Sequence, residues 1–288
     1  MRKFLNKYWG WTFLIIPLML QAIFFYFPMF QGAFYSFTNW TGLTYDFDFV
    51  GINNYKILMT DSKFFKALGF TLILTLALIV GEIVIGIWVA RALNAKIKGQ
   101  TFFRAWFFFP AVLSGLTVSL IFKQVFNYGL PAIGEVLNIE FLKTSLLGTS
   151  GGAIFAAIFV MLWQGVAMPI ILFLSGLQTI PSEITEAAAI DGANSKQTFW
   201  NIELPYLLPS ISIVFIMALK AGLTAFDQIF ALTGGGPSNS TTSIGLLVYN
   251  YAFSSNQYGY ANAIALILFA IIVLVSVLQL KLSSRFEV

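Results

Sequence analysis

Few side chains in this 288-residue sequence are suited to acid–base, redox or metal chemistry. The sequence contains no Cys and no His, and only 10% of its residues are charged. That composition excludes disulfides, thiol nucleophiles, imidazole catalysis and the common zinc, copper and haem sites. We therefore expect no metal site of the common kinds in this chain.

The most informative polar side chains lie inside apolar segments. Lys220, Thr224 and Asp227 are spaced i, i+4, i+7, so on one helix they would form a single stripe, with Gln228 beside it. Lys220 and Asp227 would then lie about 10 Å apart along the axis, too far for an easy salt bridge. Charges at bilayer depth usually face protein or water. The stripe is predicted to contact either a ligand or a partner helix.

A second cluster lies in the string MLWQGVAMP, which provides Trp163, Gln164, Gly165 and Met168. An aromatic ring beside hydrogen-bonding groups suits a sugar, because the C–H face of the sugar packs on the ring while its hydroxyls need polar partners. For Trp163, packing against other side chains is the alternative. Glu82, in another apolar segment, is interpreted as a structural group at a helix interface.

Six apolar segments must position these side chains. Hydrophobic residues make up 58% of the chain and the mean hydropathy is +0.84, which is typical of a polytopic membrane protein. A helix needs about 20 mostly apolar residues to cross the hydrocarbon. We predict an all-α fold with one membrane domain over residues 1–288. The predicted transmembrane helices are 11–34, 68–90, 105–125, 153–178, 207–231 and 260–281.

The distribution of basic residues predicts the direction of the spans. Six spans place both termini on one side, and that side, with the loops near 91–104 and 182–205, carries more Lys and Arg than the other. Both termini are therefore predicted to be cytoplasmic. The N-terminal run is interpreted as an uncleaved first span, because no small-residue cleavage site follows it and it is too long for a signal peptide.

The cytoplasmic segment 182–205 has an unusual sequence for so apolar a chain, SEITEAAAIDGANSKQTFWNIELP. Ser182 is a plausible N-cap, and the alanines after it favour a helix. Gly192 is predicted to end that helix in the left-handed conformation. Ser195 would cap a second short helix, and Pro205 would mark the entry to span five. The segment therefore predicts a helix, a glycine turn and a second helix.

This segment carries a recognisable motif. Its spacing resembles the EAA loop of ABC importer permeases, and the fuller string EAAAIDGA…FW…I.LP resembles the carbohydrate-uptake branch of that family. LTGGGPSNST, from Leu232 to Thr241, is similar to an external segment in the first permease subunit of maltose and glycerol-phosphate type systems. The maltose-type subunit carries additional spans and a large external domain, which this chain lacks. The loop residues are Glu186, Ala187, Ala188, Asp191, Gly192, Ile202, Leu204 and Pro205.

The resemblance implies a type I ABC importer permease fold, with the segment 182–205 as a coupling loop that docks on a cytoplasmic ATPase. The permease itself would hydrolyse nothing, and the sequence has no GxxxxGK[ST] phosphate loop. ATP and Mg²⁺ would bind the partner ATPase, so the resemblance implies no catalytic residue and no cofactor bound by this chain. The implied protein partners are a second homologous permease, two ATPase subunits and an extracellular or periplasmic solute-binding protein. The other implied partners are a sugar, of the oligosaccharide class, and membrane lipid, without nucleic acid. The implied location is the cytoplasmic membrane of a bacterium or archaeon.

In the maltose-type relatives, sugar contacts fall in spans four and five. The resemblance therefore implies a substrate path here, although the side chains differ and the identity of the sugar does not carry over. The candidate path residues are Trp163, Gln164, Gly165, Met168, Lys220, Thr224, Asp227 and Gln228.

Two other classes of function remain open at this point. An ion-coupled secondary transporter would also span the membrane. That class often shows repeated halves and broken helices around a midplane site. Neither feature stands out in this sequence, and the segment 182–205 would have no role. A membrane scaffold that transports nothing is the third hypothesis, and the polar stripe argues against it. Association with a cytoplasmic ATPase separates the first hypothesis from both.

Overall fold

The computed structural model of the chain describes residues 13–44, 46–95 and 99–283, and these residues are almost entirely helical. Within those ranges the one β interaction is an isolated antiparallel bridge between Thr38 and Phe49. Four helices have the length and hydropathy of membrane spans: Phe13–Tyr35, Ser62–Asn94 (α4), Ser195–Leu223 and Tyr258–Lys281, the last lying within α15 (Tyr258–Ser283).

Two further pairs of helices qualify as broken spans. Gln100–Val112 (α5) and Gly115–Leu137 meet at 96°, and Ser150–Gly165 (α8) and Ala167–Gln178 (α9) meet at 44°. When each bent pair counts as one span, the described part of the chain contains the six that the sequence predicts. The membrane-spanning, all-α prediction is confirmed.

The described residues form two compact units. The first contains the residues up to Asp61 together with Val248–Ile267, and the second contains Ser62–Leu247 together with the residues from Leu268 onward. The prediction of one membrane domain stays a prediction. Each unit is considered by itself below.

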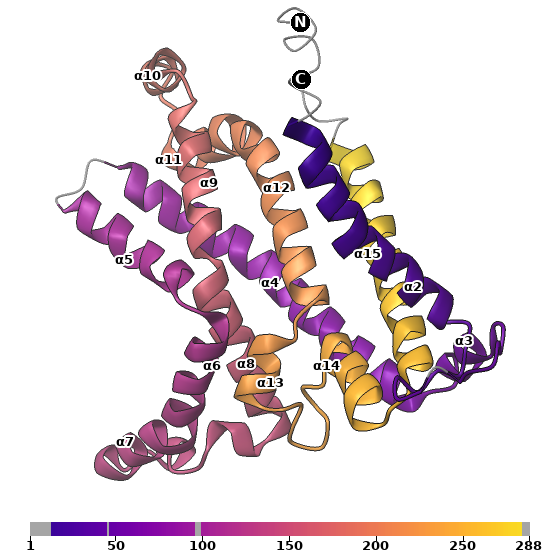
Figure 1. Cartoon of the computed structure of the whole chain (residues 1–288). Coiled ribbons are helices and arrows are strands. Elements are labelled where there is room, and N and C mark those ends of the chain that lie inside the picture. Colours follow the sequence, from indigo (N-terminus) through magenta and orange to yellow (C-terminus); the bar gives the residue numbers. More distant parts are fainter. Residues whose placement is uncertain (1–12, 45, 96–98, 284–288) are drawn as a thin grey trace, which may run out of the picture. The chain divides into compact units, whose positions relative to one another are not determined.

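In the second unit, α4 is the central helix and packs along α8, α9 and α12 (Leu204–Leu223) (Figure 1). Small residues permit the close approach of these helices, as is common in membranes. A Cβ added to Gly222 would lie 2.6 Å from the Cα of Thr75. Their core is apolar and comprises Ile87, Ala90, Leu93, Val166, Ile170, Phe173, Leu174, Leu177, Leu207 and Val214.

The third span differs from its predicted form. The sequence predicts one span over 105–125, but the helix breaks between Val112 and Gly115. Leu113 and Ser114 are extended, with ψ angles of 147° and 127°. The second half runs through α6 (Gly115–Gln124), the π-turn η2 (Val125–Gly129) and α7 (Leu130–Leu137).

The fifth span also has different limits. The predicted range was 207–231, whereas the helix runs without interruption from Ser195 to Leu223. It contains α11 (Ser195–Thr198), the π-turn η5 (Phe199–Glu203) and α12. A separate short helix, α13 (Asp227–Leu232), follows, and α14 (Ile244–Tyr249) comes after the glycine-rich loop.

The first unit contains the first span, the chain that follows it as far as Asp61, and the residues Val248–Ile267. The span contains the π-turn η1 (Ala22–Tyr26) and α2 (Phe27–Tyr35). The short helix α3 (Asn53–Leu58) is tied back to it, because the buried amide of Asn54 donates to Ser36 O at 2.7 Å and to Thr38 O at 2.9 Å. The π-turn η6 (Asn250–Ser254) and the first turns of α15 complete the unit.

Candidate functional site

The segment 182–205, predicted to be a coupling loop and called by that name below, begins with a short exposed helix, α10 (Ser182–Ile190). Pro181 occupies the cap position, and Ser182 is the first helical residue, so the prediction that Ser182 caps the helix is wrong. Proline suits this place because its fixed φ, here −59°, lets the chain enter the helix directly. Glu183 in the first turn complements the positive end of the helix dipole.

Gly192 ends α10 as predicted, in the left-handed conformation with φ +76°. Ala193 N donates to Ala188 O at 2.9 Å, and Gly192 N donates to Ala189 O at 3.2 Å. These two bonds form a Schellman motif, which satisfies the last helical carbonyls. A Cβ built on Gly192 would meet no atom within 4 Å. Glycine is therefore required here by backbone conformation and not by lack of space.

Asn194, and not Ser195, caps the helix that follows. Its Oδ1 accepts from Gln197 N at 3.0 Å, while Gln197 Oε1 accepts from Asn194 N at 2.8 Å, which is a complete capping box. The two short helices are thus separated by residues 191–194, the last of which is the cap residue Asn194. The predicted second helix exists, but it continues directly into span five.

Helix α10, which lies in the segment that the family resemblance predicts to dock on an ATPase, is open to solvent. No residue of α10 is buried, and Figure 1 shows the helix at the tip of the second unit, beyond α9 and α11. Ile190 is 86% exposed and Ile184 is 37% exposed. Glu186 and Ala187 are exposed as well, and Ala188 is half-buried. A helix of nine residues that packs on nothing is only marginally stable in water. Contact with another protein would stabilise it, so its exposed surface is suited to packing against a partner.

The far end of the loop is fastened to α4 by a contact that sequence reasoning missed. Arg91 Nε donates to Glu203 Oε2 at 2.5 Å, and Arg91 Nη2 donates to Glu203 Oε1 at 3.3 Å. The guanidinium carbon also lies 4.7 Å from the centre of the Phe199 ring. A two-pronged Arg–carboxylate pair fixes geometry as well as charge. Glu203 lies between the motif residues Ile202 and Leu204, and a charged residue at that place in the motif was the one feature of the sequence that pointed to this contact.

The remaining motif residues lie at this fastened end. Ile202 and Leu204 are half-buried, and Pro205 is exposed in the first turn of α12. Proline there does not interrupt the helix that runs from Ser195 to Leu223, and it follows directly after the π-turn η5, where the α-helical bonding pattern already changes. These residues position the loop, while Glu186 to Asp191 form its free surface.

Two of the candidate path residues meet at the break in the third span. Gln164 Nε2 donates to Leu113 O at 2.6 Å and to Pro110 O at 3.3 Å. Gln228 Nε2 donates in turn to Gln164 Oε1 at 2.8 Å. We name the set Pro110, Leu113, Gln164 and Gln228 the Gln164 junction. It joins α5, α8 and α13 at the helix break, where Pro110 O also accepts from Leu113 N at 3.2 Å.

The other span-four candidates have structural surroundings. The ring of Trp163 meets Phe122 edge to face, with centroids 5.4 Å apart, which supports packing for this residue. Gly165 lies against the carboxylate of Glu82, and a Cβ there would overlap Glu82 Oε1. Glu82 is 4% exposed, at the interface of α4 with α8, where a structural role was predicted. Met168 is exposed.

The stripe predicted from Lys220, Thr224 and Asp227 does not lie on one helix. α12 ends at Leu223, and Thr224 Oγ1 donates to Lys220 O at 2.7 Å in a local cap. Phe226 has φ −139° and ψ −66°, so the chain turns before Asp227 begins α13. The i, i+4, i+7 geometry is therefore wrong beyond Thr224. All three side chains are exposed, and their role in a substrate path stays a prediction.

The glycine-rich segment from Leu232 to Thr241 is a compact loop. The hydroxyls of Thr233 and Thr241 are 2.8 Å apart, and Thr241 Oγ1 donates to Gly236 O at 2.8 Å. Ser243 Oγ donates to Ala225 O at 2.5 Å, which fastens the loop to the chain before α13. Hydrogen bonds thus hold this loop, and the residues that follow it, against the chain at the end of span five.

Comparison with known proteins agrees with this architecture. A family model described as "Binding-protein-dependent transport system inner membrane component" matches residues 82–288. The multiple sugar-binding transport system permease protein of Streptococcus mutans is 85% identical, over 100% of this chain and 99% of that protein. A probable starch degradation products transport system permease protein of Thermoanaerobacterium thermosulfurigenes is 32% identical, over 99% and 97% of the two chains.

The fold also matches a solved transporter. A chain from the crystal structure of a bacterial ABC transporter involved in import of the acidic polysaccharide alginate superposes with a TM-score of 0.84. The match covers 98% of both chains at 18% sequence identity, so it concerns the fold. The type I importer permease fold is confirmed. Because the family model covers most of the chain and relatives align along nearly all of it, the chain belongs to the binding-protein-dependent transport system inner membrane components and is a multi-pass, non-catalytic permease subunit.

Proposed function

We propose that this chain forms half of the translocation path of an ATP-driven importer for sugars, principally oligosaccharides. The near-full-length relative named as a multiple sugar-binding transport permease supports the substrate class. The observation that carries the coupling role is α10, a helix with no buried residue that ends in a Gly192 Schellman turn. The EAA spacing of the sequence assigns that open surface to a cytoplasmic ATPase.

The proposed complex contains a second permease, two ATPase subunits and an external solute-binding protein. The family description and a solved alginate transporter, crystallised with an alginate pentasaccharide-bound periplasmic protein, support the last of these partners. ATP and Mg²⁺ are assigned to the ATPase subunits, and this chain is assigned no cofactor of its own. The complex is placed in the cytoplasmic membrane of a bacterium or archaeon, with both termini of this chain in the cytoplasm.

The structure offers a direct mechanical link for such a complex. The helix from Ser195 to Leu223 has 29 residues, and at 1.5 Å per residue it spans about 43 Å. Its cytoplasmic end is fixed to α4 through Arg91 and Glu203. Its other end leads through Thr224 to α13, whose Gln228 contacts Gln164. A displacement of the coupling loop would therefore be carried along this helix to Leu223 and would reach the Gln164 junction through residues 224–226 and α13.

The test is reconstitution of this chain with its partner permease and ATPases in proteoliposomes that contain the binding protein. We expect uptake of radiolabelled oligosaccharide to require ATP and to be insensitive to proton and sodium gradients. Glu186→Lys should lower uptake about 10-fold or more, because it reverses a charge on the surface assigned to the ATPase. Glu183→Lys is the matched charge reversal on the same helix outside the motif, and it should lower uptake less, because it loses only a dipole interaction of about 0.3–1 kcal/mol.

Two results would contradict the proposal. Uptake driven by an ion gradient without ATP would establish the ion-coupled secondary transporter instead. Equal uptake by the Glu186→Lys and Glu183→Lys complexes would remove the motif from coupling.

A further inference from the structure

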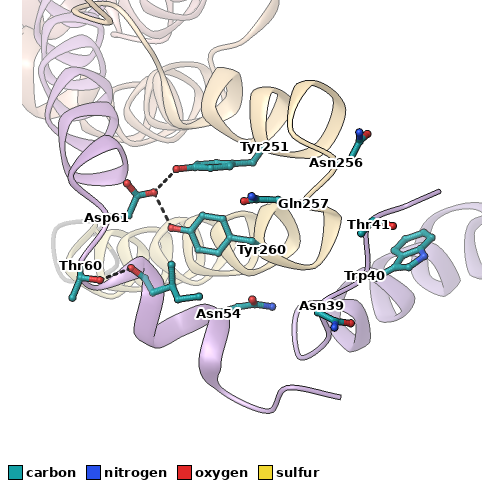
Figure 2. Close-up of a pocket in the computed structure, with 11 residues that line it drawn as sticks. Asn39, Trp40, Thr41, Asn54, Thr60, Asp61, Tyr251, Asn256, Gln257 and Tyr260 are labelled. Atoms are coloured by element: carbon teal, nitrogen blue, oxygen red, sulfur yellow. Dashed lines mark hydrogen bonds between the residues drawn. The ribbon is translucent and has the colours of Figure 1, made fainter. Parts of the chain in front are cut away.

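The first unit contains a polar cavity that belongs neither to the coupling loop nor to the candidate substrate path. Its volume is about 600 Å³, within the range of roughly 300–1,000 Å³ that is typical of small-molecule sites. Its walls come from the chain that follows the first span, from the residues before α4, and from η6 with the start of α15 (Figure 2). In the predicted topology all of these segments lie on the external side.

One wall of the cavity is rigidly organised around Asp61. Tyr251 Oη donates to Asp61 Oδ2 at 2.7 Å, and Tyr260 Oη donates to the same oxygen at 2.9 Å. The two rings meet edge to face with centroids 4.8 Å apart. Burial, followed by the hydrogen bond and charge of Asp61, raises the pKa of Tyr251 above its ordinary value. Its hydroxyl therefore stays protonated and keeps its place as a donor.

The opposite wall presents an aromatic ring that is also held in place. Trp40 stacks on Tyr35 with centroids 4.1 Å apart, and its Nε1 donates to Thr44 O at 2.7 Å. Trp40 O accepts from Gly259 N at 2.9 Å, which ties this wall to the start of α15. A ring whose rotamer and hydrogen bond are fixed before binding costs little entropy to use.

Two amide side chains that also line the cavity, those of Asn256 and Gln257, form no hydrogen bond with other described residues. Both side chains are exposed. Figure 2 shows Gln257 between the Tyr251 and Tyr260 side chains. Each amide offers two donors and one acceptor. Gln257 therefore lies beside aromatic rings with fixed positions, and the polar groups of both amides are available to a ligand.

The composition of the cavity restricts the ligand. No Lys or Arg is among the described residues that line it, and Asp61 is the one carboxylate there. That charge balance disfavours phosphates and acidic sugars. Aromatic rings beside free amides suit a neutral pyranose, since its C–H face packs on a ring while its hydroxyls both donate and accept.

We propose that this cavity is an external carbohydrate subsite that binds one neutral hexose unit before the saccharide enters the translocation path. The proposal rests on the proposed function for its substrate class and on the predicted topology for its side of the membrane. It assigns hydroxyl recognition to Asn256 and Gln257, and ring stacking to Trp40.

The test uses the complete importer in lipid nanodiscs without its binding protein. Methyl α-glucoside, methyl α-galactoside and methyl α-mannoside are the probes, and binding is measured by saturation-transfer difference NMR titration. We expect at least one glycoside to bind, and Gln257→Ala and Asn256→Ala each to weaken it about 2- to 10-fold, the effect of losing one or two modest hydrogen bonds. Ser255→Ala is the matched control, an exposed neighbour outside the cavity, and should bind normally.

Three outcomes would overturn the proposal. The first is that no glycoside binds. The second is that the amide variants bind as well as Ser255→Ala. The third is that choline binds in place of the glycosides and is lost in Asp61→Asn, which would show a cation site.

ATP-driven uptake in the reconstitution described above separates the two proposals. If uptake is normal but the amide variants have no effect, the subsite fails and the importer stands. If uptake does not need ATP, the proposed function fails whatever the glycosides do. A cysteine at the exposed Ser238, labelled by an impermeant thiol reagent in intact cells, verifies the external side.

Discussion

Helix α10 with its Gly192 turn and the Gln164 junction differ in how far along the sequence their hydrogen bonds reach. Around α10 the bonds are local: Ala193 N reaches Ala188 O, and Gln197 N reaches Asn194 Oδ1. At the junction, Gln164 bonds to Leu113, 51 residues away, and to Gln228, 64 residues away. A locally closed structure can move as one piece, whereas a junction of three distant segments changes only when those segments shift.

The difference also appears in what surrounds each region. A Cβ on Gly192 would meet nothing within 4 Å, while a Cβ on Gly115 would lie 3.2 Å from the Gln228 side chain and 3.3 Å from Gln164 Oε1. The choice of residue at Gly192 is therefore limited by backbone conformation, whereas the choice at Gly115 is limited by packing. Substitutions that separate these two limits test the comparison directly.

The largest effect is expected at Gly192. In Gly192→Val a β-branched residue must adopt φ +76°, which costs at least about 1–2 kcal/mol and favours a different turn. We expect ATP-driven uptake to fall by at least about 10-fold, with normal membrane levels on immunoblots, because nothing in the described structure packs on this residue.

Gly192→Asn is the matched control, since Asn tolerates the left-handed conformation far better. It should retain most of the uptake. If Val and Asn behaved alike, a contact with the ATPase, rather than the turn, would explain the need for glycine.

A smaller effect is expected at the junction, and on stability first. Gln164→Ala removes the donor to two carbonyls and the acceptor of Gln228, and we expect it to lower the free energy of unfolding by about 1–3 kcal/mol. Gln228→Ala removes one bond and should cost about 0.5–1.5 kcal/mol. Thermal unfolding in detergent measures both.

The double variant provides the check on this prediction. Because Gln164 and Gln228 share a hydrogen bond, their effects should not be additive. Additive losses would mean that the two side chains act independently and that the junction is not one unit.

The smallest effect is expected at the exposed end of span five. Thr224→Ala and Asp227→Asn should leave membrane levels unchanged and shift the apparent KM for the native sugar about 2- to 10-fold, since each removes or inverts one modest hydrogen bond. Asp227→Asn should be the harsher of the two, because the amide replaces an acceptor with a donor.

Thr179→Ala serves as the control for this region. Thr179 ends α9 with the same kind of local bond, from its Oγ1 to Gly176 O at 2.7 Å, but lies outside the candidate path. If Thr224→Ala behaved like Thr179→Ala, the end of span five would be structural and the sugar contacts would lie elsewhere.

The sequence alone determined the features that depend on composition and on short spacings. Long apolar runs require membrane-spanning helices, because backbone groups in lipid must be satisfied within a helix. The alanine-rich helix and the left-handed Gly192 were predictable because both follow from the preferences of a few adjacent residues. The exact caps of both short helices were missed. Pro181 precedes Ser182 at the cap position without a side-chain bond, and Asn194 precedes Ser195 with a complete capping box.

The tertiary structure alone decided where the helices break and which distant side chains meet. The sequence periodicity predicts a continuous helix from Lys220 to Asp227, but the chain turns at Phe226. The preceding residue, Ala225, is buried, and its carbonyl accepts a hydrogen bond from the Ser243 hydroxyl. The Arg91–Glu203 pair joins residues 112 positions apart, and the Asp61 contact with Tyr260 joins residues 199 apart. No local pattern encodes such pairs, because their free energy depends on burial and geometry that exist only after the helices have packed.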